Sequence, residues 1–140
     1  MKLSTIYVIV RDIEKSTDFY RKLLQEEPLY HNDDRWVQFS NYIALYNKYY
    51  DYKFINEKSS ERFNEAYIKD FVADKGVPEN NIVIFNFEVE NLFFEYKRLK
   101  DLEIGDVSDL MYVNVHMPYW YFNIIDPDGN VIEITGQYTQ

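Results

Sequence analysis

The chain of 140 residues is long enough to bury the core of one compact domain, and its 46% hydrophobic and 19% aromatic residues are typical of globular proteins rather than disordered ones. Its 15 Lys and Arg residues against 24 Asp and Glu residues give a formal net charge of −9, so we expect neither nucleic acid nor a membrane surface as a partner. The absence of Cys excludes disulfides and thiolate metal sites, and the first apolar run reaches Arg11 too soon for a signal peptide, so we expect a cytoplasmic protein.

The first part of the chain predicts a strand, a helix and further strands. β-branched and aromatic residues from Thr5 to Val10 are typical of a buried strand. Asp12 follows as a helix cap, and the apolar stripe of the helix is expected to contain Ile13, Ser16, Tyr20 and Leu23. Strands are then expected in "RWVQFS" at 35–40, in "YIALYN" at 42–47 and in "YYDYKF" at 49–54.

The same order recurs in the second half of the chain. "NIVIFNFEV" at 81–89 predicts a strand, Asn91 a helix cap, and Leu92, Tyr96 and Leu99 the helical stripe. Two strands, "YWYFNIID" and "NVIEITG", flank a turn at 126–129, where Pro and Gly favour the required backbone angles. Between the halves, "SSERFNEAYIKDFVADKG" predicts a connecting helix at about 59–76.

Two copies of one unit indicate a pseudo-twofold arrangement, with one module at about 1–55 and another at about 80–140. The curved sheets of two such modules would enclose a hollow lined from both halves, which is a good site for a small-molecule ligand. The alternative is that the abundant aromatic side chains simply fill this hollow as a core.

Three stretches carry a resemblance to a known family. "IYVIVRDIEKSTDFYRKLL" resembles the opening strand and helix of the vicinal oxygen chelate superfamily, which includes glyoxalase I, bleomycin resistance proteins and extradiol dioxygenases. "FNIIDPDGNVIEI" resembles its closing hairpin, and "FNFEVENLFFEYKRL" is a weaker match to its middle. The resemblance implies an α+β fold of two βαβββ modules, here with an additional connecting helix, usually assembled as a homodimer.

The resemblance also locates the metal-ligand positions of the superfamily in this sequence. They fall on Thr5, near Leu45, on or beside Ile84, and on Glu133, and only Glu133 has a good ligating side chain. A divalent ion needs about three protein ligands, so we expect no metal and no other cofactor. The chain's two His residues, His31 and His116, do not fall on ligand positions.

Glu133 still requires an explanation, because it lies among apolar residues of its predicted strand. A carboxylate removed from water needs donors or a cation. Without a metal, these would come from Tyr hydroxyl groups, Asn86, His116 or the positive charge of a ligand.

The sequence leaves three functions open. A metal-free binding protein, similar to bleomycin resistance proteins, would sequester an aromatic or cationic compound, and the aromatic content and net charge favour it. A metal-dependent glyoxalase-like lyase or dioxygenase would need unexpected ligands, and a scaffold or regulatory dimer would need no ligand. We therefore lean away from an enzyme and identify no catalytic residue. Strand alternation predicts a hollow lined by Tyr7, Trp36, Gln38, Tyr46, Asn86, His116, Trp120, Phe122 and Glu133, although each could instead pack in the core or at a dimer interface.

Overall fold

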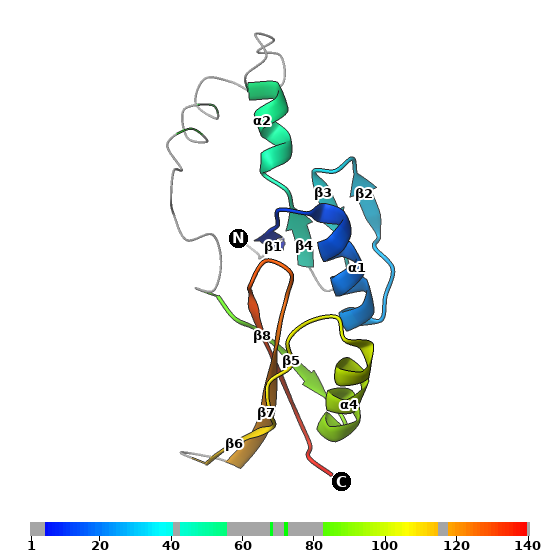
Figure 1. Cartoon of the computed structure of the whole chain (residues 1–140), viewed down its shortest axis with the longest axis vertical. Helices are drawn as coiled ribbons and strands as arrows, with labels where there is room; N and C mark the ends of the chain where they lie inside the picture. The colour runs from blue at the N-terminus through cyan, green and yellow to red at the C-terminus, as the bar shows by residue number, and fades with distance from the viewer. Residues whose placement is uncertain are drawn as a thin grey trace. The chain divides into compact units, whose positions relative to one another are not determined.

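The structure is a computed structural model, and it describes residues 5–40, 43–55, 68, 72, 83–114 and 118–139. The chain divides into two compact units (Figure 1). The first contains Met1–Thr17 and Glu26–Asn80, and the second contains Asp18–Gln25 and Asn81–Gln140. Helix α1 (Ile13–Leu24) therefore begins in the first unit and ends in the second. None of the helices in these described ranges is long and apolar enough to cross a membrane.

The first unit contains a four-stranded mixed sheet, here called sheet 1, with the order β1-β4-β3-β2. Its strands are β1 (Ile6–Ile9), β2 (Tyr30–Asn32), β3 (Trp36–Gln38) and β4 (Ile43–Tyr46). Strand β1 runs parallel to β4, and the other pairs are antiparallel. One face of sheet 1 is buried and apolar, with Val8, Val37 and Leu45 aligned across its strands.

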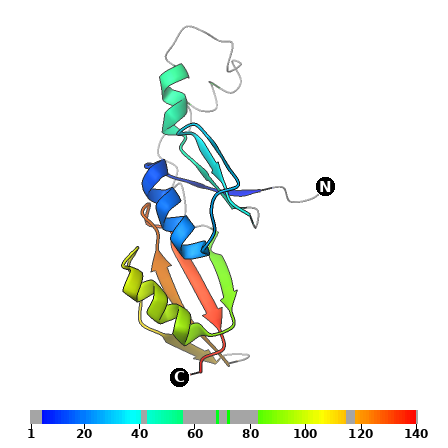
Figure 2. The same cartoon turned by 90° about the vertical axis from the view of Figure 1, so that its right-hand side faces the viewer.

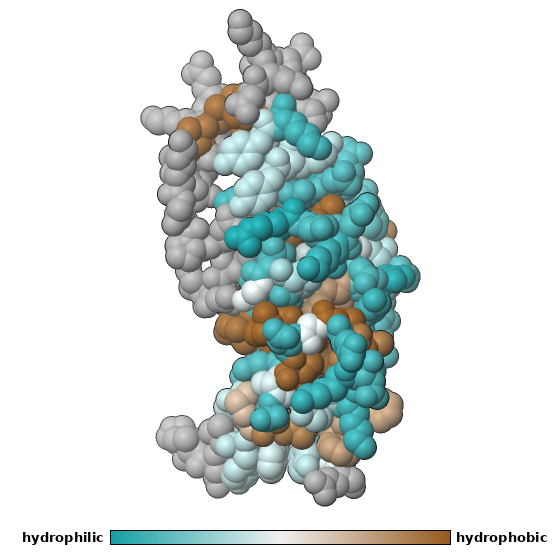
Figure 3. All heavy atoms as spheres, viewed as in Figure 1, coloured by the Kyte–Doolittle hydropathy of each residue, from teal (hydrophilic) through white to brown (hydrophobic). Residues whose placement is uncertain are grey.

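Helix α1 begins as the sequence predicts. The Asp12 side chain caps its first turn by accepting a hydrogen bond from the Lys15 backbone N–H at 3.0 Å. Ile13, Ser16, Tyr20 and Leu23, the four residues of the predicted stripe, are all buried. Hydrophilic side chains cover most of α1 on its outer side (Figure 3).

The strand predicted at 49–54 is wrong, because this segment is helix α2 (Tyr49–Ile55). Its first turn forms when the backbone N–H groups of Tyr50 and Asp51 donate to the carbonyls of Asn47 and Lys48. The missing strand of the module is β2, which the sequence analysis did not identify. All three β2 residues are exposed, so their sequence carries no alternation of apolar and polar residues.

The second unit repeats the architecture with a sheet of order β5-β8-β7-β6, here called sheet 2. Its strands are β5 (Phe85–Val89), β6 (Met111–Asn114), β7 (Pro118–Ile125) and β8 (Val131–Gly136). Strand β5 is parallel to β8, while β7 pairs antiparallel with both β8 and β6. Helix α4 (Leu92–Leu102) packs on one face of sheet 2 and does not cover the other face (Figure 2).

Helix α4 and the closing hairpin follow the sequence closely. The Asn91 side chain caps α4 by accepting from the Phe94 N–H at 2.9 Å, as predicted. Gly129 ends the hairpin turn with a φ of 83°, which favours glycine. At Gly136 a Cβ atom would lie 2.2 Å from the Val89 carbonyl oxygen, so only glycine allows this close approach of β8 to β5.

The core of the second unit lies between α4 and the covered face of sheet 2. Its fully or almost fully buried side chains are Leu92, Leu99, Phe122, Ile124, Ile132 and Ile134. The fold is therefore α+β with two βαβββ-like modules, as predicted. The expected connecting helix lies outside the described residues, apart from Ile68 and Val72, which are both helical.

Candidate functional site

Three aromatic side chains form a cluster on the face of sheet 1 that is opposite its buried face. Strand register places Trp36 beside Tyr46, while Tyr7 pairs with Ala44 on the same face. The ring centroids lie 5.4 Å apart for Tyr7 and Trp36, 5.8 Å for Tyr7 and Tyr46, and 6.1 Å for Trp36 and Tyr46. Tyr7 is 53% exposed, so the cluster offers aromatic surface to a ligand. We call these three residues the aromatic cluster.

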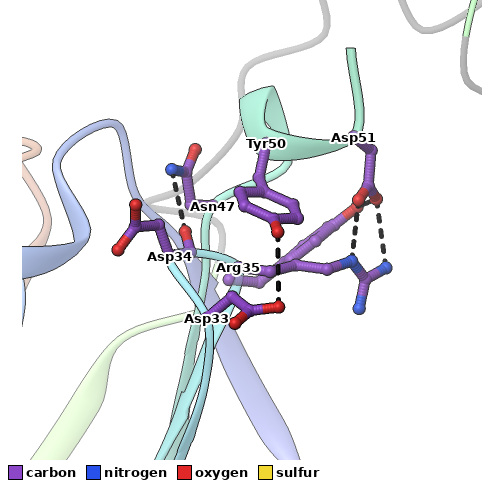
Figure 4. A network of polar contacts seen from close by, with 7 residues as sticks. Asp33, Asp34, Arg35, Asn47, Tyr50 and Asp51 are labelled. Atoms are coloured by element: carbon purple, nitrogen blue, oxygen red, sulfur yellow. Dashed lines mark hydrogen bonds and ion pairs between the residues drawn. The ribbon is translucent and has the colours of Figure 1, made fainter. Parts of the chain in front are cut away.

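A buried carboxylate from α2, Asp51, pairs with Arg35 (Figure 4) and also positions one member of this cluster. Asp51 is 1% exposed and accepts hydrogen bonds from Arg35 Nε at 2.7 Å, Arg35 Nη2 at 3.0 Å and the Tyr46 hydroxyl at 2.7 Å. The Arg35 guanidinium carbon also lies 5.0 Å from the Tyr46 ring centroid. The Tyr46 ring is therefore held at its hydroxyl by Asp51 and at its face by Arg35.

Gln38 lies on the same face of sheet 1 as the aromatic cluster, but its side-chain amide is hydrogen-bonded to the backbone. Its Nε2 donates to the carbonyls of Phe39 at 2.9 Å and Ile43 at 3.0 Å. These bonds hold the connection between β3 and β4, so the Gln38 amide hydrogens are not directed at a ligand.

The candidates on sheet 2 include a polar row around Glu133. Asn86 of β5 and Asn123 of β7 both pair in register with Glu133 of β8. Asn86 Nδ2 donates to Glu133 Oε1 at 2.6 Å, and Asn86 Oδ1 accepts from the Thr135 hydroxyl at 3.4 Å. Of the donors that the sequence left open for Glu133, Asn86 therefore supplies one.

The predicted facing of Trp120 and Phe122 is wrong. Both lie on the opposite face of β7 from Asn123, since residues alternate along a strand. Phe122 is 0% exposed, and its ring centroid lies 5.3 Å from that of Tyr96 in α4. The Trp120 ring stacks on the Tyr138 ring, with centroids 4.5 Å apart. Their side chains belong to the helix-covered side of sheet 2.

Three residues of β7 that share a face with Glu133 were not predicted from the sequence. These are Tyr119, Tyr121 and Asn123, which follow from pairing Asn123 with Glu133. The register of the closing hairpin was the signal that could have found them. His116, also predicted to line the hollow, lies outside the described residues.

The residues at the superfamily's metal positions do not suit a metal ion. Leu45 is fully buried on the apolar face of sheet 1, and Ile84 has no ligating atom in its side chain. Within the described ranges, no group of three or more His, Asp or Glu side chains could hold a metal. Glu133 and the Thr5 hydroxyl fall short of the three ligands that such a site requires.

Comparison with known proteins agrees with this architecture. A model of the glyoxalase/bleomycin resistance protein/dioxygenase superfamily matches residues 2–134. The chain belongs to this superfamily. No curated protein matches it.

Three solved structures illustrate how the superfamily fold recurs. A glyoxalase/bleomycin resistance protein/dioxygenase family enzyme from Burkholderia phytofirmans is 12% identical, with a TM-score of 0.66 and coverage of 97% of this chain and 98% of that one. A glyoxalase-related enzyme from Fulvimarina pelagi is 15% identical, with a TM-score of 0.62 and coverage of 98% and 88%. A lactoylglutathione lyase from Agrobacterium tumefaciens is 17% identical, with a TM-score of 0.60 and coverage of 96% and 92%. At these identities the likeness concerns the fold alone.

Proposed function

We propose that this superfamily member is a metal-free binding protein that holds a flat aromatic compound on the aromatic cluster of sheet 1. The observation that carries the proposal is the mutual contact of Tyr7, Trp36 and Tyr46 on one partly exposed face. Stacking on such rings contributes about 1 kcal/mol per aromatic pair beyond the burial of apolar area. A positively charged compound gains further from the net charge of −9.

The residues at the ligand positions weigh against the lyase and dioxygenase alternatives. Those reactions polarise or activate vicinal oxygens on a metal ion, which needs a complete set of ligands. In this chain two of these positions fall near Leu45 and on or beside Ile84, whose side chains are hydrocarbon. Binding without chemistry requires only the rings and the fixed geometry around Tyr46.

The test is a titration of Trp fluorescence with bleomycin and a panel of flat aromatic compounds, cationic and neutral. The chain has two Trp residues, and only Trp36 belongs to the aromatic cluster. We expect quenching to persist in Trp120→Phe and to disappear in Trp36→Phe. Tyr7→Ala should weaken binding about fivefold, which corresponds to the loss of one stacked ring.

Tyr112→Ala is the matched control, because Tyr112 is 51% exposed but belongs to β6 of sheet 2. It should leave the affinity for these compounds within twofold of the wild-type value. Equal weakening by Tyr7→Ala and Tyr112→Ala, or no quenching by any compound, would contradict the proposal.

A further inference from the structure

The polar row of sheet 2 places three side chains from neighbouring strands side by side. Asn86, Glu133 and Asn123 occupy adjacent positions on β5, β8 and β7, so they project from the same face. This face is opposite the one that contributes Ile132 and Ile134 to the core. The row therefore lies on the face of sheet 2 that α4 does not cover, with Asn86 exposed and Glu133 and Asn123 half-buried.

Hydrogen bonds fix the orientation of Asn86 within this row. Its Nδ2 donates to Glu133 Oε1 at 2.6 Å, and its Oδ1 shares the Thr135 hydroxyl with the Phe87 carbonyl, each at 3.4 Å. A carboxylate has about four lone-pair sites. One amide donor leaves the second oxygen, Glu133 Oε2, able to accept from a ligand.

Asn123 supplies a second acceptor on the neighbouring strand. Its Oδ1 is shielded from water and has no hydrogen-bond partner within the described ranges. Its backbone is fixed, because the Asn123 N–H donates to Ser108 Oγ at 3.0 Å and its carbonyl accepts from the Ser108 N–H at 2.9 Å. A shielded carbonyl without a donor is costly, so the row is incomplete without a group that carries N–H bonds.

The residue pairs of β7 and β8 on either side of the polar row add aromatic and apolar side chains to the same face. Val131 and Ile125 pair on one side of Glu133, and Tyr121 pairs with Thr135 on the other. The rings of Tyr119 and Tyr121 lie 5.6 Å apart on the same face. Aromatic faces attract cations, and apolar neighbours strengthen a charged hydrogen bond by excluding water.

We propose that Glu133 and Asn123 bind an amidinium or guanidinium group of a small molecule. Asn123 and Glu133 are directly opposite on antiparallel strands, where Cβ atoms are about 5 Å apart, so one planar amidinium with two N–H arms can donate to both side chains. Such a delocalised cation is also weakly hydrated and packs readily beside rings. The inference goes beyond the proposed function, because it concerns sheet 2 and does not require the aromatic cluster of sheet 1 to bind anything.

The probe for this site is benzamidine, with benzamide as the neutral compound of the same shape. Calorimetric titration should detect benzamidine binding at least tenfold tighter than benzamide, because only benzamidine forms a charge-assisted hydrogen bond. In ¹H–¹⁵N NMR spectra, benzamidine should shift the side-chain amide signals of Asn86 and Asn123. Loss of each signal in Asn86→Ala or Asn123→Ala assigns it.

Two variants separate specific pairing from attraction by net charge. Glu133→Gln and Glu88→Gln each remove one negative charge. Glu88 lies on the same face of sheet 2 as Glu133, one residue pair farther along, where it pairs with Thr135. We expect Glu133→Gln to weaken benzamidine binding about tenfold and Glu88→Gln to change it less than twofold. Asn123→Ala should weaken it about threefold, with circular dichroism confirming that each variant is folded.

Equal effects of Glu133→Gln and Glu88→Gln would overturn the proposal, as would equal affinity for benzamidine and benzamide or unchanged Asn86 and Asn123 signals. Titration of Tyr7→Ala with benzamidine keeps the two proposals distinct. If sheet 2 binds as inferred, the Asn86 and Asn123 side-chain signals of this variant still shift at the same benzamidine concentrations as in the wild type, even where the variant loses affinity for flat aromatic compounds.

Discussion

At the scale of single residues, Asp126 shows how one carboxylate organises the closing hairpin. It is 5% exposed, and its Oδ1 accepts from the backbone N–H groups of Asp128 at 2.9 Å and Asn130 at 2.8 Å. Its Oδ2 accepts from the Tyr20 hydroxyl at 2.9 Å and Asn130 Nδ2 at 2.6 Å. Both oxygens are thus satisfied by donors, which is how a charge persists in a buried turn.

This arrangement predicts a specific pH dependence for Tyr20→Phe. Burial, and then the negative charge of Asp126, raise the pKa of the Tyr20 hydroxyl above its ordinary value. In the unfolded chain Tyr20 ionises near pH 10, whereas in the folded protein it keeps its proton, so unfolding releases a proton above that pH. The contribution of Tyr20 to stability is therefore complete below about pH 10 and declines above it by up to about 1.4 kcal/mol per pH unit.

Urea denaturation of the wild type and Tyr20→Phe at pH 8 and pH 11 measures this effect. At pH 8 the variant should be about 1 kcal/mol less stable, because Asp126 retains its other three donors. At pH 11 the difference should shrink or reverse, since Phe cannot ionise. Parallel stability curves across this pH range would show that Tyr20 ionises equally in both states.

At the scale of elements, helix α2 depends on one buried side chain. Asp51 links the helix to Arg35, the residue before β3, and to Tyr46 of β4. Replacing Asp51 by Ala removes the partner of Arg35, whose side chain is 34% exposed and can reach water. We therefore expect a loss of about 2 kcal/mol, less than the removal of a partner from a fully buried ion pair costs.

Asp33→Asn is the matched control within the same network (Figure 4). Asp33 is exposed and accepts one long hydrogen bond from the Tyr50 hydroxyl at 3.3 Å, so its change should stay within about 0.5 kcal/mol. Thermal and urea unfolding of both variants provide the comparison. A loss in Asp33→Asn as large as in Asp51→Ala would show that Asp51 does not anchor α2.

The segment around Asp51 also shows where sequence patterns fail. "YYDYKF" is rich in aromatic residues that favour strands, but the segment is a helix in which Asp51 accepts hydrogen bonds from Arg35 and Tyr46. Strand β2 was missed because its residues are exposed on both faces. By contrast, the caps Asp12 and Asn91 act within one turn of their helices, so the sequence predicted both correctly.

The same reasoning explains the error in strand β7. In "YWYFNIID" both alternating sets contain aromatic residues, so composition does not show which set faces the core. The pairing of Phe122 with Ile134 and of Asn123 with Glu133 decides it. The candidates on β1, β3 and β4 lie on the face opposite Val8, Val37 and Leu45, which identify the core side there.

At the scale of the whole molecule, charge is the property that acts on every ligand. The chain has a formal net charge of −9, while the aromatic cluster and the polar row have different local chemistry. The homodimer implied by the resemblance stays a prediction, which light scattering of the purified protein would check. Its formation would raise the total negative charge that an approaching cation meets.

This charge predicts how salt affects binding. Raising ionic strength from about 0.02 M to 0.5 M shortens the Debye length from about 20 Å to about 4 Å, which removes the attraction of distant carboxylates but not of a contacting one. The affinity for benzamidine should therefore fall several-fold over this range, whereas that for benzamide should stay nearly constant. At 0.5 M salt, Glu88→Gln should become indistinguishable from the wild type, and Glu133→Gln should remain weaker, because a direct hydrogen bond is screened little. Calorimetric titration at both salt concentrations measures the wild-type affinities for benzamidine and benzamide and the benzamidine affinities of Glu88→Gln and Glu133→Gln. The same salt dependence for benzamidine and benzamide would show that the net charge has no part in binding.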